Sequence, residues 1–133
     1  MSNRWRIKEL PEKYDDIAAD GSEIRLLLAT EKASLVHCTL SPMRTSAATR
    51  NEKIDEIWYF IGGQGEIWFR EERDKGDGTT KEVRPGTCLT IPADVRFQFR
   101  ATGEDPLTFL CVTIPPWPGK HANVEVEPHW SPS

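Results

Sequence analysis

The chain has 133 residues, which is the size of one compact domain. Its residues are 38% hydrophobic and 29% charged, and the formal net charge of -4 gives no basic surface of the kind that binds nucleic acid. No apolar run approaches the roughly 20 residues that span a membrane, and the first ten residues lack the apolar segment of a signal peptide. We therefore expect a single soluble domain over 1–133, cytoplasmic, with neither nucleic acid nor membrane as a partner.

Helical periodicity is almost absent from the chain. Only residues 10–19 have the spacing for a helical turn or two, and Pro11 weakens that prediction because proline disrupts a helix interior. Short apolar runs between turn residues, with 10 prolines in the chain, instead favour an all-β domain. The first two strands are predicted at 24–29 and 34–40, and the polar stretch 43–53 is predicted to be a loop or an irregular strand.

The strongest local signal is a hairpin in which aromatic and β-branched residues flank the glycine-rich turn 62–65. The charged segment 70–80 is predicted to be a solvated loop, and the proline-rich tail after residue 114 is expected to cover part of the domain. The remaining strands are predicted at 56–61, 66–69, 87–91, 95–100 and 107–114. About eight short strands at this spacing predict a jelly roll or closed barrel, which leaves few free sheet edges.

The three cysteines, Cys38, Cys88 and Cys111, lie in apolar strand-like stretches. None shows the close spacing of a metal-binding pair. We interpret all three as buried free thiols, in agreement with a reducing compartment.

Two spaced motifs resemble those of the cupin superfamily. The first cupin motif ends in E-x6-G, and Glu56 and Gly63 have that spacing within DEIWYFIGGQGEIWF. The second contains G-x5-P, and Gly86 and Pro92 have that spacing within RPGTCLTIPADVRFQF. The resemblance covers roughly residues 24–118. It implies an all-β cupin fold, the double-stranded β-helix or jelly-roll barrel, with an N-terminal arm and a C-terminal tail outside the core.

The resemblance also identifies the positions at which cupins hold a metal ion. Counted from Glu56, the two histidines of the first motif correspond to Thr49 and Asn51, and the histidine of the second motif corresponds to Phe97. Glu56 alone keeps the expected ligand type. Because a hydroxyl, an amide and one carboxylate hold a transition metal weakly, we expect no metal site and no cofactor. Two motif glycines are also replaced, by Met43 and Asp94.

Strand alternation predicts which side chains line the barrel. If Glu56 points inward, the residues two and four positions later share its face, and Phe97 shares its own face with Phe99. The expected interior is an aromatic pocket around one carboxylate, a composition typical of small-molecule sites. The candidate binding residues are Thr49, Asn51, Trp58, Phe60, Phe97 and Phe99. The alternative is that the aromatic side chains simply fill the barrel.

Three functions remain open. In the first, the protein binds a small organic molecule without a metal, and Glu56 acts as acid or base in an isomerase- or lyase-type reaction, or else makes only a structural hydrogen bond. In the second, a metal-dependent dioxygenase or isomerase uses an unusual ligand set that recruits His37. In the third, the domain is a non-catalytic sensor or structural module, which a cavity too small for a ligand would favour.

Two surface features bear on partners. Arg44, Arg50 and Arg96 could attract an anionic substrate to the barrel mouth, or could be ordinary surface charges. Small cupins commonly pair through sheet faces or exchanged N-terminal strands, so the resemblance implies a homodimer. Trp5, Trp117 and Trp130 would suit such packing or could close the barrel mouth.

Overall fold

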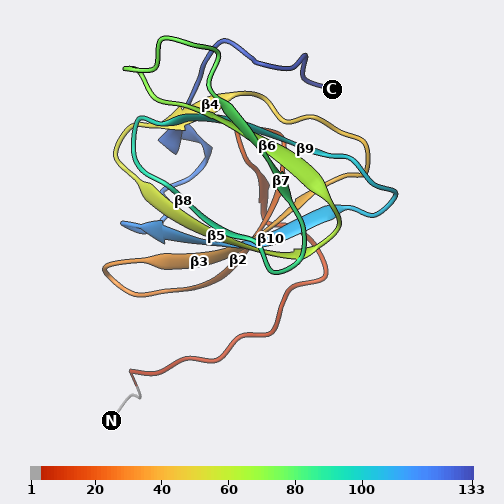
Figure 1. Ribbon diagram of the computed structural model, residues 1–133. Helices are drawn as coiled ribbons and strands as arrows, with labels where there is room; N and C mark the ends of the chain where they lie inside the picture. Colours follow the sequence, from red (N-terminus) through yellow and green to blue (C-terminus); the bar gives the residue numbers. More distant parts are fainter. Residues whose placement is uncertain (1–3) are drawn as a thin grey trace.

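The computed structural model describes residues 4–133, in which two antiparallel sheets face each other (Figure 1). The first sheet has the order β1-β2-β3-β10-β5-β8 and the second has the order β11-β4-β9-β6-β7. The strands of the first sheet are β1 (Asp16–Ile17), β2 (Glu23–Ala29), β3 (Ser34–Leu40), β5 (Asp55–Gly62), β8 (Cys88–Ile91) and β10 (Leu107–Ile114). Those of the second are β4 (Thr49–Asn51), β6 (Gly65–Arg70), β7 (Thr79–Val83), β9 (Arg96–Ala101) and β11 (Asn123–Glu125). This architecture is the all-β jelly roll that the sequence predicts.

The segment 10–19 contains no helical turn, contrary to the weak helical prediction. Its backbone is held in an extended arm along β2, because Arg25 donates hydrogen bonds to the carbonyl oxygens of Pro11 (3.0 Å) and Glu12 (2.9 Å). The Asp15 carboxylate accepts a further bond from the Leu26 backbone N–H at 2.8 Å. The one helical element in the described chain is a 3₁₀ turn at Lys120–Ala122. No helix among residues 4–133 is long and apolar enough to cross a membrane.

Four strands appear where the sequence predicts none or only an irregular one, and two of them, β1 and β11, are short pairings of the N-terminal arm and of the tail. β4 lies inside the polar stretch 43–53, and β7 begins at Thr79, at the end of the stretch predicted to be a loop. β7 is an edge strand that pairs only with β6, and four of its five residues are exposed. Since both of its faces are polar, β7 has no hydrophobic alternation from which it could be predicted.

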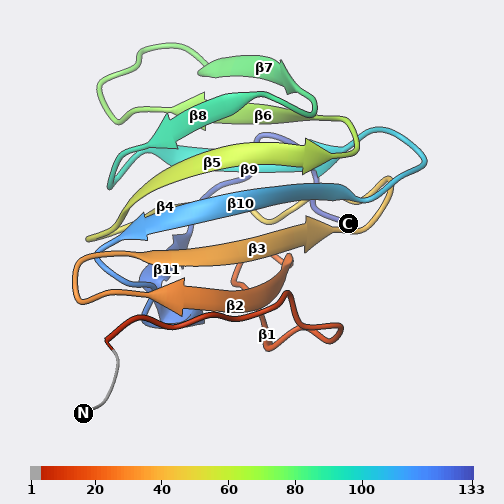
Figure 2. The ribbon, with the colours of Figure 1, turned by 90° about the horizontal axis from the view of Figure 1, so that it is seen from below.

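The strands of the first sheet lie side by side in the order given above (Figure 2). Alternation of buried and less buried residues along β5 and β10 places one face of each strand inside the barrel. In β5, Glu56, Trp58 and Phe60 are buried, whereas Ile57 and Tyr59 are exposed.

The three cysteines lie on different faces of their strands, since Cys38 and Cys111 are buried but Cys88 faces solvent. The prediction that all three thiols are buried is therefore wrong for Cys88, because its side chain leaves β8 on the outer face.

The predicted hairpin joins β5 to β6, and Gly63 lies in its turn with φ of 76°. A Cβ atom on Gly63 would lie 2.3 Å from the carbonyl oxygen of Pro106. Glycine is required here both by the left-handed backbone and by this close approach of the loop that leads into β10.

Candidate functional site

The carboxylate of Glu56 lies on the inner face of β5 and accepts three hydrogen bonds. Asn51 Nδ2 donates to Oε2 at 2.7 Å, and Trp58 Nε1 donates to Oε1 at 2.6 Å. The Cys111 thiol also donates to Oε1, at 3.1 Å. Because Glu56 is only 7% exposed, these donors replace the water that would otherwise stabilise its charge.

Asn51 links this carboxylate to the C-terminal segment. Its Oδ1 accepts a hydrogen bond from Asn123 Nδ2 at 2.9 Å, and the same amide lies 3.4 Å from Thr49 Oγ1. Asn123 reaches Asn51 because β11 pairs with β4, and this pairing places the two residues opposite each other. The structure therefore brings together Thr49, Asn51 and Glu56, as the sequence suggests, and adds Asn123, a tail residue that no pattern identified.

A second buried carboxyl, Asp20, completes the polar group. Its Oδ1 accepts hydrogen bonds from the backbone N–H of Ser22 at 2.9 Å and from the Ser22 hydroxyl at 2.6 Å. Burial raises the pKa of Asp20, the bonds from Ser22 partly offset that rise, and the charge of Glu56 adds to it. Asp20 lies in the loop between β1 and β2, where AADGS resembles any polar turn, so sequence reasoning missed it.

The two carboxyls border a small cavity inside the barrel. Its volume is about 30 Å³, and its wall includes Asp20, Glu56, Cys38 and Cys111. Trp117, from the segment that follows β10, lines it as well. Burial raises the pKa of both thiols well above the usual range, and the two carboxyls raise it further, so both cysteines are neutral at physiological pH. A space of this size matches about one water molecule.

The predicted aromatic binding residues mostly fill the barrel. Trp58 stacks on Phe109 with ring centroids 4.0 Å apart and meets Phe97 and Phe99 edge-on at 5.6 and 5.1 Å. Trp58 borders the small cavity, whereas Phe60, Phe97 and Phe99 do not line it. All of these side chains are at most 2% exposed. The open aromatic pocket expected from alternation is thus occupied by the aromatic rings themselves.

His37 lies on the outer face of β3, opposite the barrel interior. Its neighbours Val36 and Cys38 belong to the buried core, so alternation directs His37 outward, beside Arg25 of β2. Burial lowers the pKa of His37, and the nearby Arg25 lowers it further. The hypothesis that His37 supplies an internal metal ligand is therefore wrong.

Comparison with known proteins identifies the family. A family model for the cupin domain matches residues 36–113, more than half of the chain. The chain is a member of the cupin superfamily. An uncharacterized protein of Methanocaldococcus jannaschii is 26% identical over an alignment 129 residues long, which covers 90% of this chain and 96% of that protein.

Solved structures show the same cupin fold at low sequence identity. An uncharacterized conserved protein with a double-stranded beta-helix domain from Klebsiella pneumoniae aligns with a TM-score of 0.67 and 18% identity, covering 94% of this chain and all of that chain. A variant of the Streptomyces protein PAC13 with uridine aligns with a TM-score of 0.66 and 13% identity, covering 95% of this chain and 93% of that one. At these identities the likeness concerns the fold.

The residues at the metal positions of the cupin motifs are poor ligands for a transition metal ion. Both oxygens of Glu56 are engaged by protein donors, Asn51 bonds to Glu56 and Asn123, and Phe97 has no ligating atom. Among residues 4–133, no cluster of three or more His, Cys, Asp and Glu side chains could hold a metal ion. The donor set therefore does not fit the transition metal ion that cupins hold.

The cupin backbone is nevertheless retained where its motif glycines are lost. Met43 and Asp94 stand at two of those glycine positions, and they are the two non-glycine residues in the described chain with positive φ, at 62° and 71°. Such a backbone costs a non-glycine residue about 1–2 kcal/mol. The strand connections of the fold thus dictate the left-handed turns even without glycine.

Proposed function

We propose that this cupin binds a small, donor-rich organic molecule at the inner cavity, with Glu56 as its acid–base residue. The observation that carries the proposal is the pair of buried carboxyls, Asp20 and Glu56, on one cavity wall that contains no Lys, Arg or His. Two buried carboxyls without a cation favour a ligand that carries hydroxyl or amino groups. The Streptomyces neighbour, solved with uridine, a molecule that bears hydroxyl groups, agrees with this ligand class.

The environments of the two carboxyls suit different roles. Glu56 is arranged as an acceptor, because three donors point at its oxygens. Asp20 retains its proton to higher pH than an ordinary aspartic acid, since burial raises its pKa. Isomerisation and dehydration each require one group that takes a proton from the substrate and another group that gives a proton to it. Two neighbouring carboxyls in different environments suit these two roles. Such a reaction would not need a metal ion.

The small volume means that a ligand enters only if the cover moves. Trp117 and Asn123, both from the C-terminal segment, line the cavity and are only partly buried. Displacement of this segment would open the end of the barrel that holds both carboxyls. The alternative is a non-catalytic module with a filled barrel, which the cavity of about 30 Å³ and the packed aromatic rings favour.

Ligand-observed NMR with short polyols and amino alcohols, from glycerol to ethanolamine, tests the proposal. We expect binding to the wild type, stronger binding to Trp117→Ala because the cover is smaller, and a loss of about tenfold in Glu56→Gln, which removes an ionic acceptor. Arg44→Gln, an exposed substitution outside this cavity, serves as the control. If even Trp117→Ala binds none of these probes, the filled-module alternative is preferred.

We also propose that two copies pair through the outer face of the first sheet. Ile57, Tyr59 and Ile61 alternate along β5 on this face and are 40%, 48% and 43% exposed, and Ile114 beside them is 42% exposed. A contiguous apolar face is typical of an interface. Light scattering should give the mass of a dimer for the wild type and of a monomer for Tyr59→Glu. If the wild type stays monomeric over a 100-fold range of protein concentration, the dimer is ruled out.

A further inference from the structure

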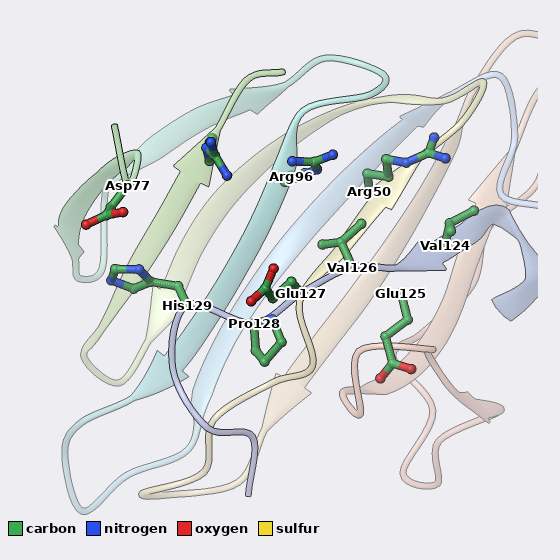
Figure 3. Close-up of a pocket in the computed structure, with 10 residues that line it drawn as sticks. Arg50, Asp77, Arg96, Val124, Glu125, Val126, Glu127, Pro128 and His129 are labelled. Atoms are coloured by element: carbon green, nitrogen blue, oxygen red, sulfur yellow. The ribbon is translucent and has the colours of Figure 1, made fainter. Parts of the chain in front are cut away.

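A groove separate from the barrel interior lies between the outer face of the second sheet and the C-terminal segment (Figure 3). Its volume is about 560 Å³, within the usual range for small-molecule sites. Strands β4, β6 and β9 contribute arginines to it, and residues 124–129 contribute the opposite wall. Thr49 and Phe97 of the same strands point into the barrel, so the groove uses the opposite face.

Three arginines stand side by side in this groove. Arg70 of β6 and Arg96 of β9 are direct cross-strand partners. The pairing of Thr49 with Phe97 sets Arg50 of β4 next to Arg96 on its other side. Like charges directly opposite each other destabilise a sheet, so this row requires a compensating negative charge.

The protein supplies little of that compensation. Arg50 forms an ion pair with Asp94 at 3.2 Å, whereas Arg96 forms no ion pair or side-chain hydrogen bond within residues 4–133. Arg70 reaches only the carbonyl oxygen of Asp74, at 3.4 Å, and its Nε is buried without a hydrogen-bond partner. A buried guanidinium N–H without an acceptor is costly, and a bound anion would satisfy it.

The carboxylates that line the groove do not fill this role. Asp77, Glu125 and Glu127 line the groove, but none lies within 4.0 Å of the three guanidinium groups. Figure 3 shows the Glu125 side chain directed away from Arg50 and Arg96, whereas the Glu127 carboxylate points toward the middle of the groove. The centre of the groove is thus open to an external anion, with Glu127 as its internal competitor.

We propose that this groove binds a small phosphate-bearing molecule, a phosphate monoester dianion held by Arg50, Arg70 and Arg96. Planar guanidinium forks match phosphate oxygens, and a dianion with three terminal oxygens can satisfy three of them. At one end of the groove the His129 imidazole stacks flat on Trp68, with ring centroids 5.2 Å apart. This imidazole offers a surface for an organic group attached to the phosphate. The site does not depend on the function proposed for the barrel interior.

Isothermal titration calorimetry of the full chain with phenyl phosphate, inorganic phosphate and malonate tests the proposal. We expect phenyl phosphate to bind more tightly than inorganic phosphate, and both more tightly than malonate. Arg96→Gln and Arg70→Gln should each weaken phosphate binding about tenfold or more, because each removes charge-assisted hydrogen bonds. Arg44→Gln removes an exposed arginine elsewhere and should change nothing.

Glu127→Gln should change phosphate affinity in the opposite direction to the arginine variants. It removes the competing carboxylate without removing any phosphate donor, so binding should become several-fold tighter even if the arginine variants fold poorly. The proposal is overturned if phosphate does not bind at millimolar concentration, if Glu127→Gln leaves affinity unchanged, if the folded arginine variants bind like the wild type, or if malonate binds as well as phosphate.

Discussion

Replacement of Phe109 by alanine tests whether the aromatic rings fill the barrel. Phe109 is 1% exposed and stacks on Trp58 at 4.0 Å, with Phe60 and Phe99 at 5.1 and 5.5 Å. Truncation of a buried phenylalanine costs about 3–5 kcal/mol, because both transfer energy and packing are lost. Against a typical total of about 5–15 kcal/mol, Phe109→Ala should lose a large share of the free energy of unfolding.

The cost can be measured by urea unfolding followed by circular dichroism, with the slope compared between variants. A loss of 3–5 kcal/mol corresponds to a fall in Tm of about 10–25 °C for a chain of this size. The control is Tyr14→Ala, which truncates an aromatic side chain that is 48% exposed and should cost under about 0.5 kcal/mol.

Phe109 also borders the inner cavity, so Phe109→Ala should extend it by an apolar space among the rings of Trp58, Phe60 and Phe99. Such cavities bind benzene, and benzene should raise the Tm of Phe109→Ala but not that of the wild type. A cost near that of Tyr14→Ala, or equal effects of benzene on both proteins, would refute the filled barrel and restore the open aromatic pocket.

Three further outcomes follow from buried or exposed polar groups. Because burial raises the folded pKa of Asp20 above its ordinary 3.8, its stabilising contribution is complete below that value and is lost as pH rises through the folded pKa. Asp20→Asn should therefore gain stability relative to the wild type as the pH rises above 3.8 in urea titrations, and parallel pH profiles would contradict this. Ellman's reagent should modify Cys88 in the folded protein, and Cys38 and Cys111 only on unfolding, so a second fast thiol would contradict their burial. Gln98→Leu removes the hydrogen bonds that Gln98 makes with Ser46 and with backbone groups of the C-terminal segment. The substitution should lower the free energy of unfolding by about 1–3 kcal/mol. It should also make the C-terminal segment sensitive to limited proteolysis.

The predictable part of the fold comes from local signals. Alternation in 95–100 and the glycine-rich turn at 62–65 locate β9 and the β5–β6 hairpin, because a half-buried strand imposes a period of two on its residues. β4 and β7 lack that signal. β4 has three residues, and β7 has polar residues on both faces, so their pairing is decided by neighbouring strands.

The candidate site also has one part that the sequence predicts and another part that it does not. The motif spacing around Glu56 indicates its inward direction and its proximity to Asn51, because both residues lie at fixed motif positions on two consecutive strands, β4 and β5, one in each sheet. Asp20 and Asn123 come from a loop and from the tail, and their arrival beside Glu56 depends on contacts between segments far apart in the chain.

The sequence by itself determined that this protein is a cupin and that the residues of its motif no longer provide a set of metal ligands. Those properties depend on residue type and spacing, which are local. Only the tertiary structure decided that the aromatic rings close the barrel, that a second carboxyl faces Glu56, and that Arg50, Arg70 and Arg96 form one row. Each of these depends on strand register between distant segments, and register is fixed by the packing of the whole barrel.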